Sequence, residues 1–145
     1  MRYTTTRELP AVSVDSAWQS LVRVTEWPQW TASMEQLEFL DGDLHPGARV
    51  RVRQPGLRTT VYTVERWEPG VAFAWSANPS GMRVEATHEL ITDLYPLRMW
   101  LEIELSGGAA PLISLLLGRR MRRYVNLEAD GLRRFAQQIE SAART

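Results

Sequence analysis

The C-terminal third of the chain constrains the fold most strongly, because from Pro111 to Ala143 it has the apolar spacing of one long helix. Nearly everything before it is typical of short strands. About thirty residues at 1.5 Å each span roughly 45 Å, enough to cross a small sheet. We therefore expect a sheet and one helix to enclose a space. The side chains on the inward helix face are Ile113, Leu117, Met121, Tyr124, Gly131, Leu132, Phe135 and Ile139.

Turn signals at short intervals divide the region before this helix into strands, a pattern that favours an antiparallel meander. We expect six strands here, which with an N-terminal strand gives a curved antiparallel sheet of about seven. The turn signals are Asp41-Gly42, Pro46-Gly47, Pro55-Gly56, Pro69-Gly70, Asn78 to Gly81 and Gly107-Gly108.

The N-terminal region predicts one strand followed by two short helices. Residues 2–13 alternate loosely between polar and apolar, as a strand does. Asp15 or Ser16 is expected to cap the first helix. Pro28 interrupts the chain before a second helical turn near Trp30 to Ser33. The complete order is then strand, two short helices, six strands and one long helix, an α+β arrangement.

Alternation within the strands predicts which side chains point toward the helix. Tyr62 can be oriented in two ways, because Tyr62 with Val64 and Val61 with Thr63 are both acceptable inward pairs. Trp100 should point outward, where it either marks the face of a homodimer or packs beneath a loop. The other inward sets are Phe73 and Trp75; Val84, Ala86, His88 and Leu90; and Met99, Leu101, Ile103 and Leu105.

The bulk composition is that of an ordinary globular protein with a single domain over residues 1–145. The chain is 44% hydrophobic and 23% charged, and its formal net charge is zero. A neutral chain argues against nucleic acid and anionic membranes as partners. No apolar run approaches the roughly 20 residues that span a bilayer, and no signal segment begins the chain. We expect a cytoplasmic location without membrane insertion.

Two missing residue types narrow the chemistry. The chain has no cysteine, which excludes disulfides, thiolate ligands and a cysteine nucleophile. It has no lysine either, which excludes Schiff-base chemistry and a P-loop lysine. Arginine as the only cation is typical of high-GC coding, and we expect a bacterial source. No metal-ligand spacing, dinucleotide motif or serine-nucleophile motif is present, so we expect neither a metal nor a cofactor.

Two local patterns accompany this order of elements. They are VTEWPQW (Val24 to Trp30) and RRYVNLEADGLRRF (Arg122 to Phe135). Together with the element order they resemble the polyketide cyclase/dehydrase branch of the SRPBCC, or START-like, superfamily, over essentially the whole chain. The resemblance implies a helix-grip fold, in which a strongly curved antiparallel sheet wraps round the C-terminal helix and a deep, largely apolar cavity lies between them.

The same resemblance implies function only broadly. Family members include aromatase/cyclases that act on polyketide chains, lipid and hormone carriers, and many proteins without an assigned activity. They share the position of the cavity more than a set of catalytic residues, so no catalytic motif is carried over. The leading hypothesis is a protein that binds a small hydrophobic, lipid- or polyketide-like ligand. The alternative is a polyketide cyclase or aromatase that uses polar residues of the cavity wall.

Two histidines differ in their expected roles. His88 shares an inward face, where it either transfers protons at the cavity wall or is a structural histidine bonded to a neighbouring element. His45 lies beside Pro46-Gly47 in a turn and should be exposed. Because the two lie in such different places, they are not expected to bind a metal together.

The centre of the long helix carries three polar side chains on its inward side. Tyr124 could hold a ligand oxygen or stabilise an enolate, or be a core aromatic whose hydroxyl is satisfied locally. Arg120 and Glu128 flank it by one turn on either side. Arg120 could bind a carboxylate, while Glu128 could act as a base or pair with Arg120 or a strand arginine.

The remaining candidates are apolar and aromatic. Trp27 and Trp30 bracket Pro28 near the expected cavity mouth, where they either form a lid or brace the packing. Gly131 would let a strand approach the helix closely, and Gly118 could permit a bend. The full set of expected ligand-binding residues is Tyr62, Trp75, His88, Met99, Leu101, Leu117, Arg120, Met121, Tyr124 and Glu128.

Overall fold

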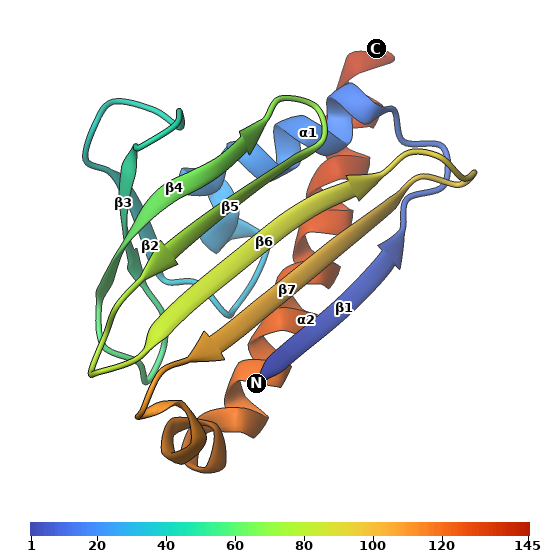
Figure 1. The fold of residues 1–145 in the computed structure, drawn as a ribbon. Helices are drawn as coiled ribbons and strands as arrows, with labels where there is room; N and C mark the ends of the chain where they lie inside the picture. Colours follow the sequence, from blue (N-terminus) through green and yellow to red (C-terminus); the bar gives the residue numbers. More distant parts are fainter.

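The computed structural model describes residues 1–145 as a seven-stranded antiparallel sheet that curves around one long helix, α2 (Figure 1). The strand order is β1-β7-β6-β5-β4-β3-β2. The predicted α+β helix-grip fold and its order of elements are confirmed. The bounds are β1 Arg2–Glu8, α1 Val14–Val22, the 3-10 helix η1 Val24–Gln29, β2 Gln36–Phe39, β3 Arg49–Arg53, β4 Thr60–Glu68, β5 Ala72–Ala77, β6 Arg83–Ile91, β7 Arg98–Ser106 and α2 Ala110–Ala143.

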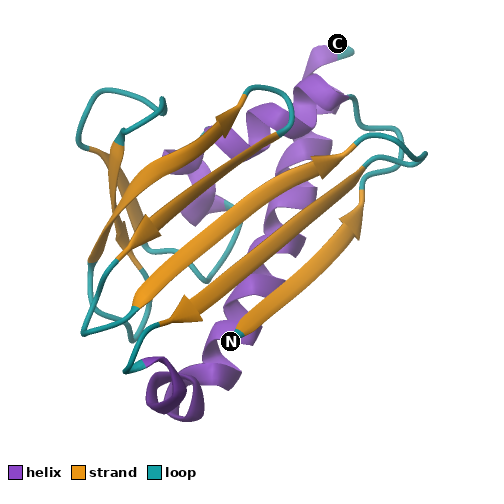
Figure 2. Cartoon of the chain, viewed as in Figure 1, coloured by secondary structure: helices purple, strands orange, loops and turns teal.

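The first helix begins at a different cap from the one expected. Ser13, rather than Asp15 or Ser16, has the extended backbone of a cap residue, and its side chain accepts a hydrogen bond from the Ser16 amide. The strand before it is also shorter than residues 2–13, because β1 ends at Glu8 where its pairing with β7 ends. Figure 2 shows that α1 and α2 lie on the same face of the sheet.

The second helical turn lies earlier than predicted. It is η1, with Pro28 inside it, and not a turn at Trp30 to Ser33. Short 3-10 segments tolerate proline better than a long helix does, since few backbone donors there need a partner. Trp27 is fully buried and its Nε1 donates to the Ser20 carbonyl, while Trp30 stacks on Phe135 at a centroid distance of 5.1 Å. Both tryptophans brace the packing.

The inward faces follow the predicted alternation. On β7, Met99 and Leu101 are at most 3% exposed, and His88 on β6 is equally buried. Burial also settles the ambiguous strand: Val64 is 2% exposed and Val61 is 42% exposed, so Tyr62 and Val64 form the inward pair on β4. The core therefore lies between the concave face of the sheet and the helices.

Polar contacts fasten α2 along one flank. At its start, Tyr3 of β1 shares a hydrogen bond with Ser114. In its middle, the Arg7 guanidinium lies 2.7 Å from Asp130 and holds the pKa of that carboxyl below its usual range. Near its end, Glu140 accepts a hydrogen bond from the Ser13 amide, which lowers the pKa of Glu140 to about 2.

Two glycines of α2 allow other groups to come close. At Gly118 a Cβ atom would stand 2.9 Å from the Tyr3 hydroxyl. Figure 1 shows the first turns of α2 at an angle to the rest of the helix. At Gly131 a Cβ atom would collide with the Trp30 carbonyl oxygen and lie 2.9 Å from the Thr31 side chain. The group that approaches Gly131 is thus the backbone after η1, and not a strand as predicted.

Two surface expectations are also resolved. Trp100 alternates with the buried Met99 and Leu101 on β7, as predicted, and is itself half-buried. Three exposed leucines lie near the start of α2: Leu112, Leu115 and Leu116 are 59%, 81% and 67% exposed. A homodimer stays a prediction. His45 is exposed, as predicted. None of the helices is both long and apolar enough to span a membrane.

The contact at Gly131 predicts an unusual response to alanine. Replacing a glycine within a helix by alanine normally stabilises a protein by about 1 kcal/mol. We expect Gly131→Ala to lower the free energy of unfolding by about 1–3 kcal/mol, because the methyl group overpacks the contact with Trp30. Gly108→Ala, in the turn just before α2, is the control for an added methyl group that meets no neighbour, since nothing lies within 4 Å of its Cβ position. A neutral or stabilising Gly131→Ala in urea unfolding would contradict the close contact.

Candidate functional site

An apolar cavity opens between the sheet and the first half of α2. We call it the outer cleft; its volume is about 140 Å³, and nine of its fourteen lining residues are hydrophobic. Ile113, Leu117 and Met121 form its helix wall. The other lining residues come from strands β3, β4, β6 and β7 and the loops between strands: Val52, Gln54, Leu57, Arg58, Thr60, Tyr62, Pro79, Ser80, Met82, Val84 and Ile103.

A second, much smaller cavity lies deeper between the sheet and α2. This inner chamber has a volume of about 20 Å³, which is room for one water molecule. It shares Val52, Gln54, Tyr62 and Ile103 with the outer cleft, so the two cavities adjoin at these four residues. Its remaining walls are Met34, Trp75, Ala86, His88 and Glu128. Both spaces are lined mainly by hydrophobic residues, and the inner chamber also has Gln54, His88 and Glu128 in its wall.

His88 and Glu128 meet at the inner chamber. The Nε2 atom of His88 lies 3.2 Å from Oε1 of Glu128, and the two side chains are 3% and 8% exposed. When the carboxylate is ionised it only accepts, so Nε2 carries the proton and Nδ1 of the neutral ring becomes an acceptor. Nδ1 is buried without any hydrogen-bond partner. Glu128 therefore pairs with a histidine and not with Arg120 or a strand arginine, which corrects one expectation.

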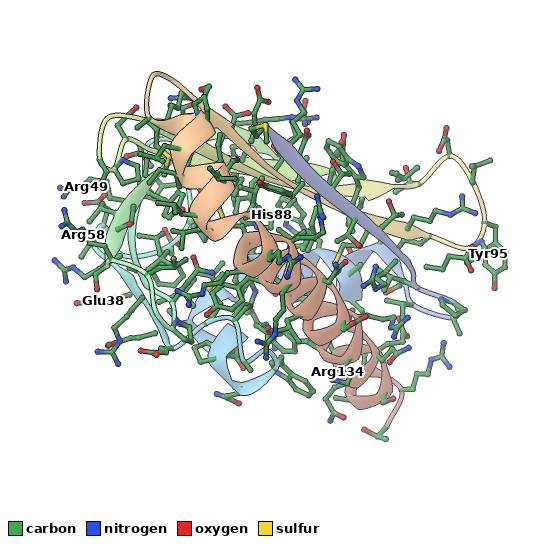
Figure 3. All side chains as sticks on the ribbon, turned by 90° about the horizontal axis from the view of Figure 1, so that it is seen from below. Glu38, Arg49, Arg58, His88, Tyr95 and Arg134 are labelled. Atoms are coloured by element: carbon green, nitrogen blue, oxygen red, sulfur yellow. The ribbon has the colours of Figure 1, made fainter.

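Aromatic rings hold the imidazole of His88 in place. Phe73 stacks on it at a centroid distance of 4.4 Å, and Trp75 meets it edge-on at 5.5 Å. Trp27 of η1 lies 5.3 Å from it on another side. Figure 3 shows His88 in the interior close to α2, whereas Arg58 lies at the edge of the molecule. The three aromatic rings thus fix the orientation of the imidazole and make its surroundings largely apolar, which strengthens its contact with Glu128.

Tyr62 stands where the two cavities meet, and its ring lies 5.5 Å from that of Trp75. Burial, with a further contribution from the nearby Glu128 carboxylate, raises the pKa of Tyr62 to about 12. The hydroxyl therefore keeps its proton at neutral pH and can donate a hydrogen bond to a bound group.

Two predicted site residues donate hydrogen bonds to the loop between β3 and β4. The Tyr124 hydroxyl donates to the carbonyl of Pro55, and Arg120 donates to that of Gly56 at 3.0 Å. Neither residue lines the outer cleft or the inner chamber. The expectation that they face a ligand is thus corrected: both hold the loop against α2.

The other predicted site residues fall into two groups, those that line a cavity and those that do not. Leu117 and Met121 line the outer cleft, Tyr62 lines both cavities, and Trp75, His88 and Glu128 line the inner chamber. Met99 and Leu101 lie in the packed core and line neither cavity, because the apolar pattern marks inward side chains without showing which of them meet open space.

Three wall residues shared by both cavities were missed: Val52, Gln54 and Ile103. Gln54 follows the end of β3, and its side-chain amide donates to the Ser33 carbonyl at 3.2 Å. No periodic pattern reaches a residue just past a strand, so the sequence carried no signal for it. Val52 could have been found, since it alternates with exposed arginines on β3.

Comparison with known proteins identifies the family. Residues 1–140 match the family described as polyketide cyclase / dehydrase and lipid transport. The chain belongs to this family. The predicted resemblance is thereby confirmed over nearly its whole length. Among curated proteins, none matches the chain in sequence.

Solved structures share the fold of this family member at low sequence identity. Hypothetical protein jhp0584 from Helicobacter pylori superposes with a TM-score of 0.80 at 15% identity, covering 94% of this chain and 88% of that one. TTHA0849 from Thermus thermophilus gives 0.69 at 13% identity, with both chains covered completely. StfQ, the di-domain ARO/CYC of the steffimycin biosynthetic pathway, gives 0.69 at 14% identity, covering 99% of this chain and 51% of that chain.

The environment of Tyr62 predicts a separate step in an alkaline titration. In the folded protein, burial favours the neutral phenol of Tyr62 over the tyrosinate. The neutral phenol therefore contributes fully to the stability of the fold below pH 10, and this contribution is lost as the pH rises through about 12. We expect Tyr62→Phe to remove a tyrosinate absorbance step near pH 12. Tyr95→Phe, at an 87% exposed tyrosine, is the control and should leave that step in place. If Tyr62→Phe instead removes absorbance near pH 10, the buried position of the hydroxyl is wrong.

Proposed function

We propose that the protein binds a small hydrophobic ligand, lipid- or polyketide-like, in the outer cleft between the sheet and α2. The observation that carries this proposal is the apolar lining of a cleft that leads toward a few polar groups. Ligand sites in proteins have this composition, with apolar walls for affinity and convergent polar groups for orientation. The family description, which includes lipid transport, supports the same assignment. A cytoplasmic location and a bacterial source remain predictions.

Leu117 and Leu116 offer a matched pair of substitutions that tests the cleft. Leu117 lines it, while the neighbouring Leu116 is 67% exposed. We expect Leu117→Trp to weaken binding of the fluorescent apolar probe N-phenylnaphthylamine at least about tenfold, a loss of about 1.4 kcal/mol, because the indole occupies the cleft. Leu116→Trp should change the dissociation constant less than about twofold. Equal effects of both variants in a fluorescence titration would place the probe elsewhere.

A second candidate is a cyclase-type activity, favoured by the His88–Glu128 pair. Cyclisation of a poly-keto chain needs a base to remove a proton next to a carbonyl and a donor to stabilise the enolate. His88, oriented by Glu128, can serve as the base, and the neutral Tyr62 hydroxyl can serve as the donor. In this candidate mechanism Tyr62 replaces Tyr124 and Arg120, which are bound to the loop. StfQ and BexL, which are both di-domain ARO/CYC proteins, have the same fold.

Substitutions of the two histidines distinguish a cyclase activity from ligand binding without catalysis. If poly-β-keto mimics are turned over by the wild type, we expect His88→Ala to lower kcat by about 10²–10⁴-fold, the usual contribution of a general base. His45→Ala, at an exposed turn, should leave kcat unchanged. The measurement is product formation by mass spectrometry alongside probe binding. Binding without turnover in the wild type would exclude the cyclase candidate and leave the binding function intact.

A further inference from the structure

One polar atom of a residue that lines the inner chamber lacks a hydrogen-bond partner within the protein. Nδ1 of His88 is buried and unpartnered. The Glu128 carboxylate accepts a hydrogen bond from Nε2 of the same ring, and it lines the chamber as well. Buried polar atoms are nearly always paired, so an unpartnered one beside a small cavity indicates a group that arrives from outside the chain.

The hydrogen-bonding character of the chamber selects that group. With the Glu128 carboxylate ionised and the imidazole neutral, both the carboxylate and Nδ1 of His88 accept hydrogen bonds, so the arriving group has to be a hydrogen-bond donor. Tyr62 keeps its own hydroxyl proton and can donate in return. A carboxylate would be repelled by Glu128, and a ketone would leave both acceptors unsatisfied. A hydroxyl group both donates and accepts.

The volumes of the two cavities agree with a hydroxyl group in the chamber and indicate the size of the rest of the ligand. The chamber of about 20 Å³ holds a group of one heavy atom. The outer cleft of about 140 Å³ is close to the roughly 150 Å³ of an engineered apolar cavity that binds benzene. The enclosed space thus accommodates one ring, and any larger portion of a ligand would extend toward solvent past Leu57 and Arg58.

We propose that the outer cleft and the inner chamber form one composite site for a small hydroxylated aromatic, such as a phenol. The ring lies in the outer cleft between Met121 of α2 and Ile103 of β7, and the hydroxyl enters the chamber and donates to the His88–Glu128 pair. This inference rests on the proposed binding function and adds the chemical class of the ligand.

A pair of compounds that differ by one hydroxyl tests the site. We would titrate isotope-labelled protein with 4-methylphenol and with toluene and follow amide shifts by NMR. The wild type should bind 4-methylphenol at least about tenfold more tightly, since a hydrogen bond to a charged group is strong. Glu128→Gln should reduce this ratio below about threefold while toluene binding stays within about twofold. Glu38→Gln, at a half-exposed carboxylate, is the control and should keep the wild-type ratio.

The outcomes separate the two proposals. Equal affinity for both compounds in the wild type overturns the hydroxyl subsite and leaves hydrophobic binding standing. No binding of either compound overturns the proposed function and the subsite with it. Should Glu128→Gln fail to fold, Tyr62→Phe removes the donor that faces the chamber and keeps the ring, and an unchanged ratio in that variant would overturn the composite site.

Discussion

The position of α2 and the aromatic packing of the core both depend on the contact between His88 of β6 and Glu128 of α2. Taking a carboxylate out of water costs several kcal/mol, and the imidazole offsets that cost only when its ring is held in position. Phe73, Trp75 and Trp27 provide that support. The requirement fixes the position of α2 against the sheet at its middle. It also concentrates three of the chain's large aromatic side chains on one short length of the core.

This arrangement explains why the space under the helix is divided. Where the aromatic rings pack against the His88–Glu128 pair, little open volume remains, and the chamber holds about 20 Å³. Toward the start of α2 the helix wall consists of Ile113, Leu117 and Met121, and the cleft is about seven times larger. Open volume thus decreases along the helix toward the His88–Glu128 pair. A helix-grip fold leaves such a gradient available, and the side chains of the individual chain decide how it is used.

The sequence predicted the sheet, the long helix and the burial of His88 because each follows from a local period. It also placed Glu128 on the inward helix face, and two buried ionisable groups require partners, so their pairing could have been inferred. The contacts of Arg120 and Tyr124 could not. Their acceptors are loop carbonyls 64 and 69 residues away, and the path of a loop has no period. For the same reason the sequence could not show that Met99 packs in the core without meeting a cavity.

The two flanks of α2 are held in different ways. On one side its side chains Ser114, Asp130 and Glu140 bond to β1 and to the start of α1, at the beginning, middle and end of the helix. Other polar side chains of α2 bond to three different neighbours. Arg120 and Tyr124 hold the loop between β3 and β4, Glu128 bonds to His88 of β6, and Arg134 donates to the Trp30 carbonyl after η1. The helix is thus held at several points along its length, whereas the loop between β3 and β4 reaches it through two side-chain hydrogen bonds. Moving this loop away from α2 would break those two bonds and leave the contacts of the helix with β1, β6 and α1 intact.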